Sequence, residues 1–118
     1  MEKKTFTSAF KNSRCLIPIS GWYEWKEEEG IKQPYYFSSN SSSILYAAGL
    51  YWNRSSGDIE SSIITREAVT DLEVIHNRSP LLLNKEKRDM WISDLSSEVI
   101  YSEILDYKYS DIEFYKVD

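Results

Sequence analysis

The strand-like segments of this chain come first in the sequence, and its helical patterns come late. Short apolar and aromatic runs separated by turn-forming residues predict strands at 15–19, 22–26, 33–37, 44–52, 59–65, 80–83 and 112–117. Apolar residues at helical spacing, with Asn84 and Ser96 or Ser97 as capping residues, predict helices at 67–75, 85–95 and 97–106. A regular strand–helix alternation is missing, so we expect an α+β fold with mainly antiparallel strands and two or three short helices.

The size and composition of the chain are those of one ordinary domain. Its 118 residues are enough for a single modest core, and the 14% of aromatic residues favours strands packed face to face. No apolar run approaches the roughly 20 residues that span a bilayer, so we expect no contact with a membrane. Cys15 is the single cysteine, which excludes an internal disulfide and favours a reducing cytoplasm.

Glu24 and His76 are the residues best suited to proton transfer. Glu24 lies among aromatic residues at 21–25, where desolvation would raise its pKa, although a surface glutamate with an ordinary pKa is the simpler interpretation. His76 is the only histidine; it could shuttle a proton, or its ring could bond a backbone carbonyl at a helix end. A lone histidine without a cluster of other ligand residues predicts no metal site, and we expect no cofactor.

Three further residues have a functional and a structural interpretation. Thr65 could donate a hydrogen bond into a site at the end of a strand, or it could cap a following helix. Arg78 could bind a phosphate or carboxylate with two hydrogen bonds, or it could simply be solvated. Cys15 opens an apolar run, and a structural role is favoured over a nucleophilic one because only Arg14 lies near enough in sequence to lower its pKa.

Aromatic residues could provide a surface for unpaired bases, although core packing is their default role. The candidates are Trp22, Tyr23, Trp25 and Tyr51. The formal net charge of −5 opposes DNA binding by the chain as a whole, but a local basic groove is compatible with a negative total. Two of the four side chains on one exposed face would favour the stacking interpretation.

Several of these residues stand in a pattern that resembles the SRAP (SOS response-associated peptidase) family. R-C-L-I-P at 14–18 and G-W-Y-E-W at 21–25 resemble the first family motif, and K-Q-P-Y-Y at 32–36 fits a second stretch. T-R-E-A at 65–68 and H-N-R-S-P at 76–80 resemble the family's T-x-x-A and H-x-R-M-P, with serine in place of methionine. The motifs keep the family's order and separation over nearly the whole chain, so the resemblance is specific.

This resemblance implies a curved, barrel-like sheet and the processing of abasic sites in single-stranded DNA during the SOS response. In the family, an N-terminal cysteine attacks the ring-opened sugar aldehyde, and its thiol and α-amine close a thiazolidine that crosslinks protein and DNA. The resemblance assigns proton transfer to Glu24 and His76 and implies a cytoplasmic, nucleoid-associated protein. The residues that it places at the abasic site or the adjacent DNA are Thr65, Arg78, Trp25 and Trp22.

The chain departs from the family pattern toward its ends. Residue 2 is a glutamate, and the family's Cys-Gly-Arg and Trp-Asn-Ala-Arg segments and its final segment are not found. We therefore expect residues 1–118 to form one SRAP-like domain that corresponds to the central part of the family fold and is inactive alone. A monomer is expected unless a separate N-terminal fragment pairs with it. A cysteine-type peptidase and a non-catalytic partner module are the alternative functions.

Overall fold

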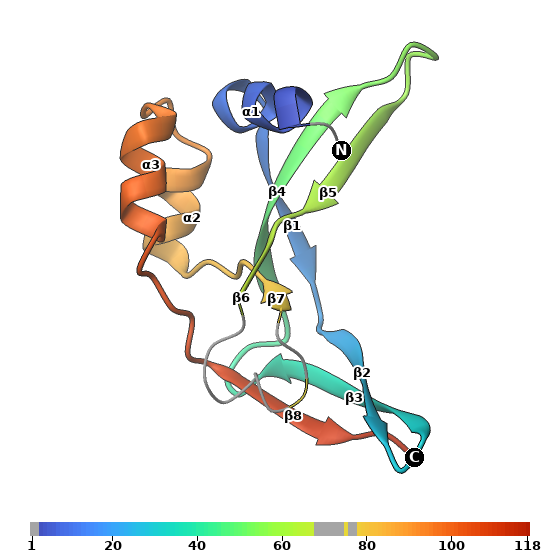
Figure 1. Cartoon of the computed structure of the whole chain (residues 1–118). Helices are drawn as coiled ribbons and strands as arrows, with labels where there is room; N and C mark the ends of the chain where they lie inside the picture. The colour runs from blue at the N-terminus through green and yellow to red at the C-terminus, as the bar shows by residue number, and fades with distance from the viewer. Residues whose placement is uncertain (1–2, 68–74, 76–77) are drawn as a thin grey trace.

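Two antiparallel sheets follow each other along the length of the molecule in this computed structural model, which describes residues 3–67, 75 and 78–118 (Figure 1). The first sheet has the order β1-β4-β5, with strands Arg14–Ile19, Leu45–Asn53 and Ile59–Ile63. The second has the order β2-β3-β8, with strands Trp22–Glu28, Ile31–Ser39 and Ile112–Lys116. A short pair, β6 (Thr65–Glu67) and β7 (Arg78–Pro80), lies between the two sheets (Figure 1).

The hairpin between β2 and β3 shows how local sequence sets the register. Glu29 and Gly30 both have positive φ angles, 52° and 78°, which suits a two-residue turn that matches the twist of the strands. This turn pairs Trp22 with Phe37 and Tyr23 with Tyr36. Because side chains alternate between the faces of a strand, the two pairs lie on opposite faces of the sheet.

Three helices lie beside the first sheet within the described residues (Figure 1). They are α1 (Lys3–Asn12), α2 (Lys85–Trp91) and α3 (Ser97–Ile104). The predicted caps of the last two are confirmed, because Asn84 accepts a hydrogen bond from the Lys87 amide at 3.0 Å and Ser96 accepts one from the Val99 amide at 3.3 Å.

The largest core cluster holds the helices against the first sheet. Trp91 at the end of α2 is fully buried, and its ring meets Phe10 of α1 edge to face at 5.5 Å between centroids. Its indole N–H donates to the Cys15 carbonyl of β1 at 2.8 Å. One residue thus connects α2 to both α1 and the sheet, with Ala48, Leu50, Leu81, Leu83 and Ile100 buried around it.

The predicted α+β class with mainly antiparallel strands is confirmed, but the barrel-like closure is wrong for this chain. A barrel requires the outer strands of a sheet to pair with each other. Within the described part of the chain, β1 and β5 each have one neighbour in the first sheet, and β2 and β8 each have one in the second. The two sheets therefore remain open.

Several predicted boundaries also differ. The run 59–65 divides at Ile64, whose amide donates to the Ala48 carbonyl while its own carbonyl accepts from Leu81. The run 80–83 is not a strand, since β7 covers Arg78–Pro80 and Leu82 forms only a single bridge with Ala47. Helix α1 was not predicted from the sequence. Most of the helix predicted at 67–75 falls outside the described residues.

No helix of the described ranges is both long enough and apolar enough to cross a membrane.

Candidate functional site

Glu24 lies on the more protected face of β2. The exposure of this strand alternates, with Trp22, Glu24 and Lys26 half-buried and Tyr23 and Trp25 exposed. This is the period of two that a strand imposes on its side chains. The carboxylate of Glu24 therefore projects from the same face as Trp22, among the aromatic residues of the second sheet.

Trp22 forms the floor of this face. Its ring stacks on Phe37 with 4.9 Å between centroids and 11° between planes, and Phe37 is buried together with Ile75. Trp22 also packs against the cluster of Leu45 and Leu82, so it lies where the two sheets meet. Its indole N–H is buried and has no hydrogen-bond partner among the described residues.

Thr65 and Arg78 are brought together by the short β6–β7 pair. The Arg78 guanidinium donates to the Thr65 carbonyl at 2.9 Å and to the Thr65 hydroxyl at 3.1 Å. Both residues are exposed, so this end of the pair offers a cation and a hydroxyl to solvent. The two motif residues stand 13 positions apart in sequence and form one polar unit in the structure.

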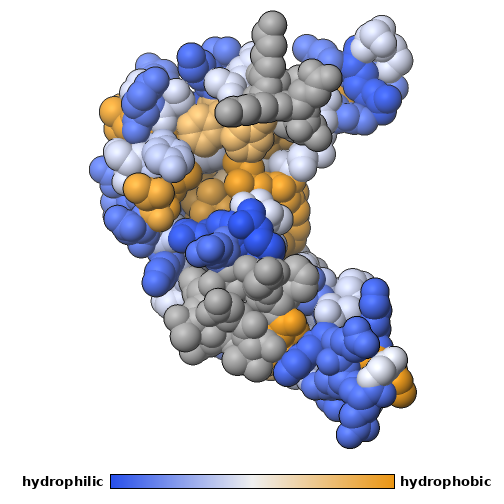
Figure 2. Space-filling model, viewed as in Figure 1, coloured by the Kyte–Doolittle hydropathy of each residue, from blue (hydrophilic) through white to orange (hydrophobic). Residues whose placement is uncertain are grey.

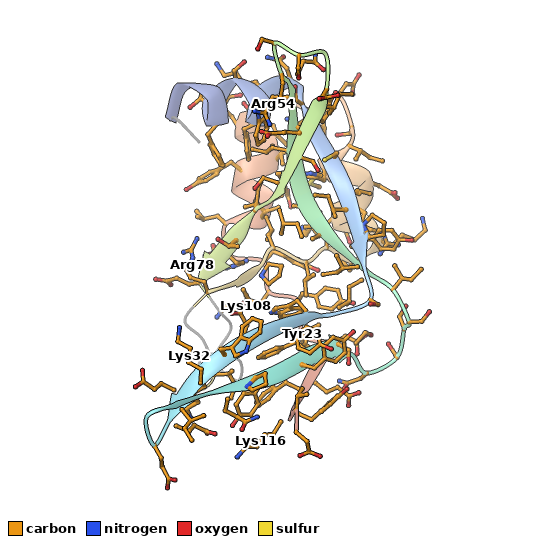
Figure 3. The ribbon with its side chains drawn as sticks, turned by 90° about the vertical axis from the view of Figure 1, so that its right-hand side faces the viewer. Tyr23, Lys32, Arg54, Arg78, Lys108 and Lys116 are labelled. Atoms are coloured by element: carbon orange, nitrogen blue, oxygen red, sulfur yellow. The ribbon has the colours of Figure 1, made fainter. Side chains whose placement is uncertain are left out.

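Ile75 links this polar unit to the face that carries Glu24. Ile75 is buried beside Phe37, in the cluster against which Trp22 packs. Ile75 and Arg78 are three positions apart in sequence, which limits the distance between their Cα atoms to about 11 Å. Arg78 lies near the junction of the sheets (Figure 3), and Thr65 is hydrogen-bonded to it. His76, which was also predicted as a site residue, lies outside the described residues.

The opposite face of the second sheet carries a row of aromatic side chains. Tyr23 and Trp25 are 52% and 54% exposed, with 6.4 Å between ring centroids. Register places Tyr36 beside Tyr23 at 4.8 Å and Tyr115 beside Tyr36 at 5.8 Å. Tyr23 and Trp25 were candidates from the sequence, but Tyr36 and Tyr115 were missed, because only the pairing of β2, β3 and β8 reveals them.

Charged groups of both signs flank this site. On the Glu24 face, the Tyr35 hydroxyl donates to Glu28 at 2.9 Å and Lys116 approaches the same carboxylate at 3.5 Å. The Tyr35 hydroxyl, followed by Lys116, lowers the pKa of Glu28, and the same hydrogen bond raises the pKa of Tyr35. Glu28 is therefore an ionised structural partner of Tyr35.

Residues 1–118 match the family model described as SOS response associated peptidase (SRAP). The chain belongs to the SRAP family. It is 33% identical over 123 residues to the abasic site processing protein YobE of Bacillus subtilis (strain 168). This alignment covers 98% of this chain and 56% of YobE. It is 30% identical over 125 residues to the abasic site processing protein YMR114C of Saccharomyces cerevisiae. That alignment covers 98% of this chain and 34% of YMR114C.

Solved structures show the same fold as this SRAP chain. A crystal structure of a protein from Bacteroides thetaiotaomicron has a TM-score of 0.85 at 26% identity. The superposition covers 99% of this chain and 54% of the Bacteroides chain. The crystal structure of a phage-related protein from Bordetella bronchiseptica has a TM-score of 0.72 at 29% identity. The superposition covers 95% of this chain and 56% of that protein. The SRAP chain thus spans about half the length of the Bacillus relative and of these two structures.

Cys15 has the surroundings of a structural thiol in this SRAP domain. It lies in β1 opposite Gly49, and its sulfur approaches the space that a side chain at position 49 would occupy. Burial raises the pKa of the Cys15 thiol. A raised pKa leaves less thiolate at neutral pH, which is the reverse of what a peptidase nucleophile requires.

No cluster of three or more histidine, cysteine, aspartate or glutamate side chains within 3–67, 75 and 78–118 is arranged to hold a metal ion. The site combines the Glu24 carboxylate, the hydrogen-bonded pair of Arg78 and Thr65, and the aromatic side chains on the two faces of the second sheet.

Proposed function

We propose that this SRAP chain binds unpaired DNA at abasic sites and supplies the groups that position the lesion and transfer protons. Glu24 and His76 transfer protons, and Thr65 and Arg78 contact the lesion and its neighbouring phosphate. The pairing of Thr65 with Arg78, next to the junction where Ile75 packs on the Glu24 face, is the observation that carries the proposal. The relatives, named abasic site processing proteins, support the choice of substrate.

The chemistry of an abasic site suits these groups. Its ring-opened form is an aldehyde, and opening the sugar or adding an amine or thiol to the aldehyde moves protons that a carboxylate or imidazole can carry. Glu24 is half-buried beside Trp22, which restricts its access to water. Arg78 provides a donor pair of fixed geometry for a phosphate, and its bonds to Thr65 orient the guanidinium.

The exposed aromatic row gives unpaired bases a place to stack. Base–aromatic stacking tolerates any sequence, since every base has a flat face. Because β2 has a sheet partner on one side only within the described residues, a DNA strand that crosses this edge can contact Trp25 on one face and approach Glu24 on the other. Trp22, packed on Phe37, supports the Glu24 face from below.

In the family's reaction, a cysteine thiol and α-amine add to the aldehyde and lose water to form a thiazolidine. Cys15 is the one thiol in this sequence, and it lies within a strand, where its own backbone amine is part of a peptide bond. We therefore propose that the 118-residue chain binds the lesion without forming this bond.

Binding to abasic DNA tests the proposal directly. We expect the chain to bind a fluorescent single-stranded oligonucleotide with one abasic site, and to leave no covalent adduct on a denaturing gel. Arg78→Ala should weaken binding about tenfold, since one phosphate contact is lost. The slope of the logarithm of the binding constant against the logarithm of the salt concentration should fall by about one. Arg54→Ala is the matched control, because Arg54 pairs with Glu60 at the far end of the first sheet (Figure 3). Equal effects of the two substitutions would contradict a role for Arg78.

The aromatic row makes a separate prediction. Trp25→Ala should weaken binding to the same oligonucleotide by about tenfold or more, because stacking contributes about 1–3 kcal/mol per base. Tyr101→Ala removes an aromatic ring of similar exposure, 56% against 54%, from α3 and should leave the affinity unchanged. Anisotropy titrations measure both. Unchanged affinity in Trp25→Ala would remove the stacking face from the proposal while leaving the Arg78 contact intact.

A further inference from the structure

Each strand of the second sheet carries one lysine, and the alternation of side chains divides these lysines between the two faces. They are Lys26 of β2, Lys32 of β3 and Lys116 of β8. Lys26 follows Glu24 by two positions and shares its half-buried face. The register places Lys116 on the Glu24 face as well, and Lys32 on the opposite face. Two amines are therefore candidates for a role beside the Glu24 carboxylate.

Lys26 is the nearer of these two lysines to Glu24. The Cα atoms of residues two apart on a strand are about 6.6 Å apart, whereas Lys116 lies two strands away from Glu24, at about 9.6 Å. The Lys116 ammonium also lies 3.5 Å from the Glu28 carboxylate. Within the described residues, Lys26 is in no hydrogen bond or ion pair. After the Tyr35 hydrogen bond and Lys116, its charge also lowers the pKa of Glu28, so its ammonium lies over this face.

Glu24 and Lys26 stand on a strand that is open along one edge. Within residues 3–67, 75 and 78–118, β2 pairs with β3 alone. A DNA strand can therefore reach both side chains from the free edge of β2 without separating any pair of strands. Figure 2 shows largely hydrophilic surface at the end of the molecule that the second sheet forms, which suits the approach of a charged backbone.

An amine next to a carboxylate is the pair of groups that condensation with an aldehyde requires. The neutral amine attacks the carbonyl carbon, and a C–N bond forms. The carboxylate takes a proton from the nitrogen and returns it to the new hydroxyl group, which leaves as water. The products are an imine and one water molecule, and no oxidant or reductant is consumed. The aldehyde is that of the ring-opened abasic sugar, so this step rests on the proposed function.

We propose that the Lys26 Nζ forms a reversible imine with C1′ of the abasic sugar, and that Glu24 carries the proton between nitrogen and oxygen. This bond needs one nitrogen and no thiol, so it is compatible with Cys15 being a structural residue. Hydrolysis of the imine returns the free amine and the aldehyde. The imine therefore leaves no adduct on an ordinary denaturing gel, where water reverses it.

Reduction with sodium borohydride tests the imine, because hydride converts its C=N bond into a stable secondary amine. The 118-residue chain is mixed with a single-stranded oligonucleotide that contains one abasic site. We expect an adduct only after reduction, and peptide mass spectrometry should locate it on Lys26. An oligonucleotide with a tetrahydrofuran in place of the abasic sugar has no aldehyde and should give no adduct.

Variants are compared at DNA concentrations that saturate each of them by anisotropy. Lys26→Arg keeps the positive charge but has no neutral amine, and it should reduce the yield of adduct at least tenfold. Glu24→Gln should slow the appearance of the adduct at least tenfold, because its side chain cannot accept the proton. Lys32→Arg and Lys116→Arg are the matched controls on the same sheet and should change the yield by less than twofold. Thermal melting checks that the variants fold.

The outcomes separate this inference from the proposed function. Abasic DNA that binds by anisotropy but gives no adduct after reduction would overturn the imine and leave the proposed function standing. An adduct located on Lys116 or on the α-amine of Met1 would overturn the assignment to Lys26, as would an equal loss in Lys26→Arg and Lys32→Arg. A lack of DNA binding would overturn the proposed function and the imine together. The mass-spectrometric result on the unmodified chain does not depend on whether any variant folds.

Discussion

Replacing Arg14 with alanine is expected to lower the free energy of unfolding by about 3–4 kcal/mol. Arg14 stands in the first SRAP motif, directly before Cys15. Its importance is structural, since its guanidinium donates to backbone carbonyls of two separate parts of the chain.

The hydrogen bonds of Arg14 connect the ends of α1 and α2. Its Nη1 donates to the Phe10 carbonyl at 2.6 Å, and its Nε donates to the Trp91 carbonyl at 2.7 Å. Its Nη2 donates to the Ser93 and Leu95 carbonyls at 3.1 and 3.2 Å. The last carbonyls of a helix lack partners within the helix, and a cation there also interacts favourably with the helix dipole. Removing one side chain therefore leaves carbonyls of two helix ends without their donor.

Urea denaturation followed by far-ultraviolet circular dichroism measures this loss. Burial lowers the pKa of Arg14, but an arginine remains charged throughout the neutral range, so the loss should not depend on pH there. Arg14→Lys keeps the charge but not the forked geometry and should recover less than half of the loss. Arg54→Ala, which removes an exposed ion pair, should cost less than about 1 kcal/mol. A loss in Arg14→Ala no larger than that in Arg54→Ala would show that the carbonyls are satisfied by water instead.

The elements that the sequence predicts well are those fixed by neighbouring residues. The Asn84 and Ser96 side chains each accept a hydrogen bond from an amide three positions ahead. The central strand predicted at 44–52 is β4, which pairs with β1 on one side and β5 on the other. The caps and the apolar run of β4 are each contained in a short stretch of sequence.

The elements that the sequence misses depend on contacts between distant residues. The segment of α1 has no acidic residue in its first turn, and short helices are marginal on their own, so α1 needs Ala9 buried in the core and Phe10 against Trp91. The open sheets likewise depend on which strands pair at the edges, which motif order does not determine.

The candidate site divides in the same way. The family motifs identify Glu24, Thr65 and Arg78, and the structure adds that the last two are hydrogen-bonded. No motif brings Tyr36 and Tyr115 to the face of Tyr23 and Trp25, because that grouping follows from the register of three strands. The role of each residue in DNA processing stays a prediction that the binding experiments above address.

Gly21→Ala is expected to damage both the fold and the aromatic row, with a loss of about 2–3 kcal/mol in unfolding free energy. A Cβ at position 21 would lie well under 3.0 Å from the Phe37 carbonyl oxygen and from the Tyr36 hydroxyl, closer than real Cβ contacts come. The Tyr36 ring can rotate away, but the Phe37 carbonyl belongs to the backbone of β3, which pairs with β2 from Trp22 onward. The strand pair must therefore separate locally to admit one methyl group.

The displacement of Tyr36 connects this loss to function. Tyr36 lies between Tyr23 and Tyr115 in the aromatic row, at 4.8 and 5.8 Å between ring centroids, so moving its ring interrupts the stacking face. We therefore expect Gly21→Ala to weaken binding of abasic single-stranded DNA several-fold, even at a temperature where the variant is still folded. Ser20→Ala, a change at the exposed neighbouring position, is the control for both denaturation and binding. If Gly21→Ala loses stability but binds DNA as the unmodified chain does, the row does not contact DNA. If it loses neither, β3 yields at Phe37 and the close packing at Gly21 does not set the geometry of this sheet.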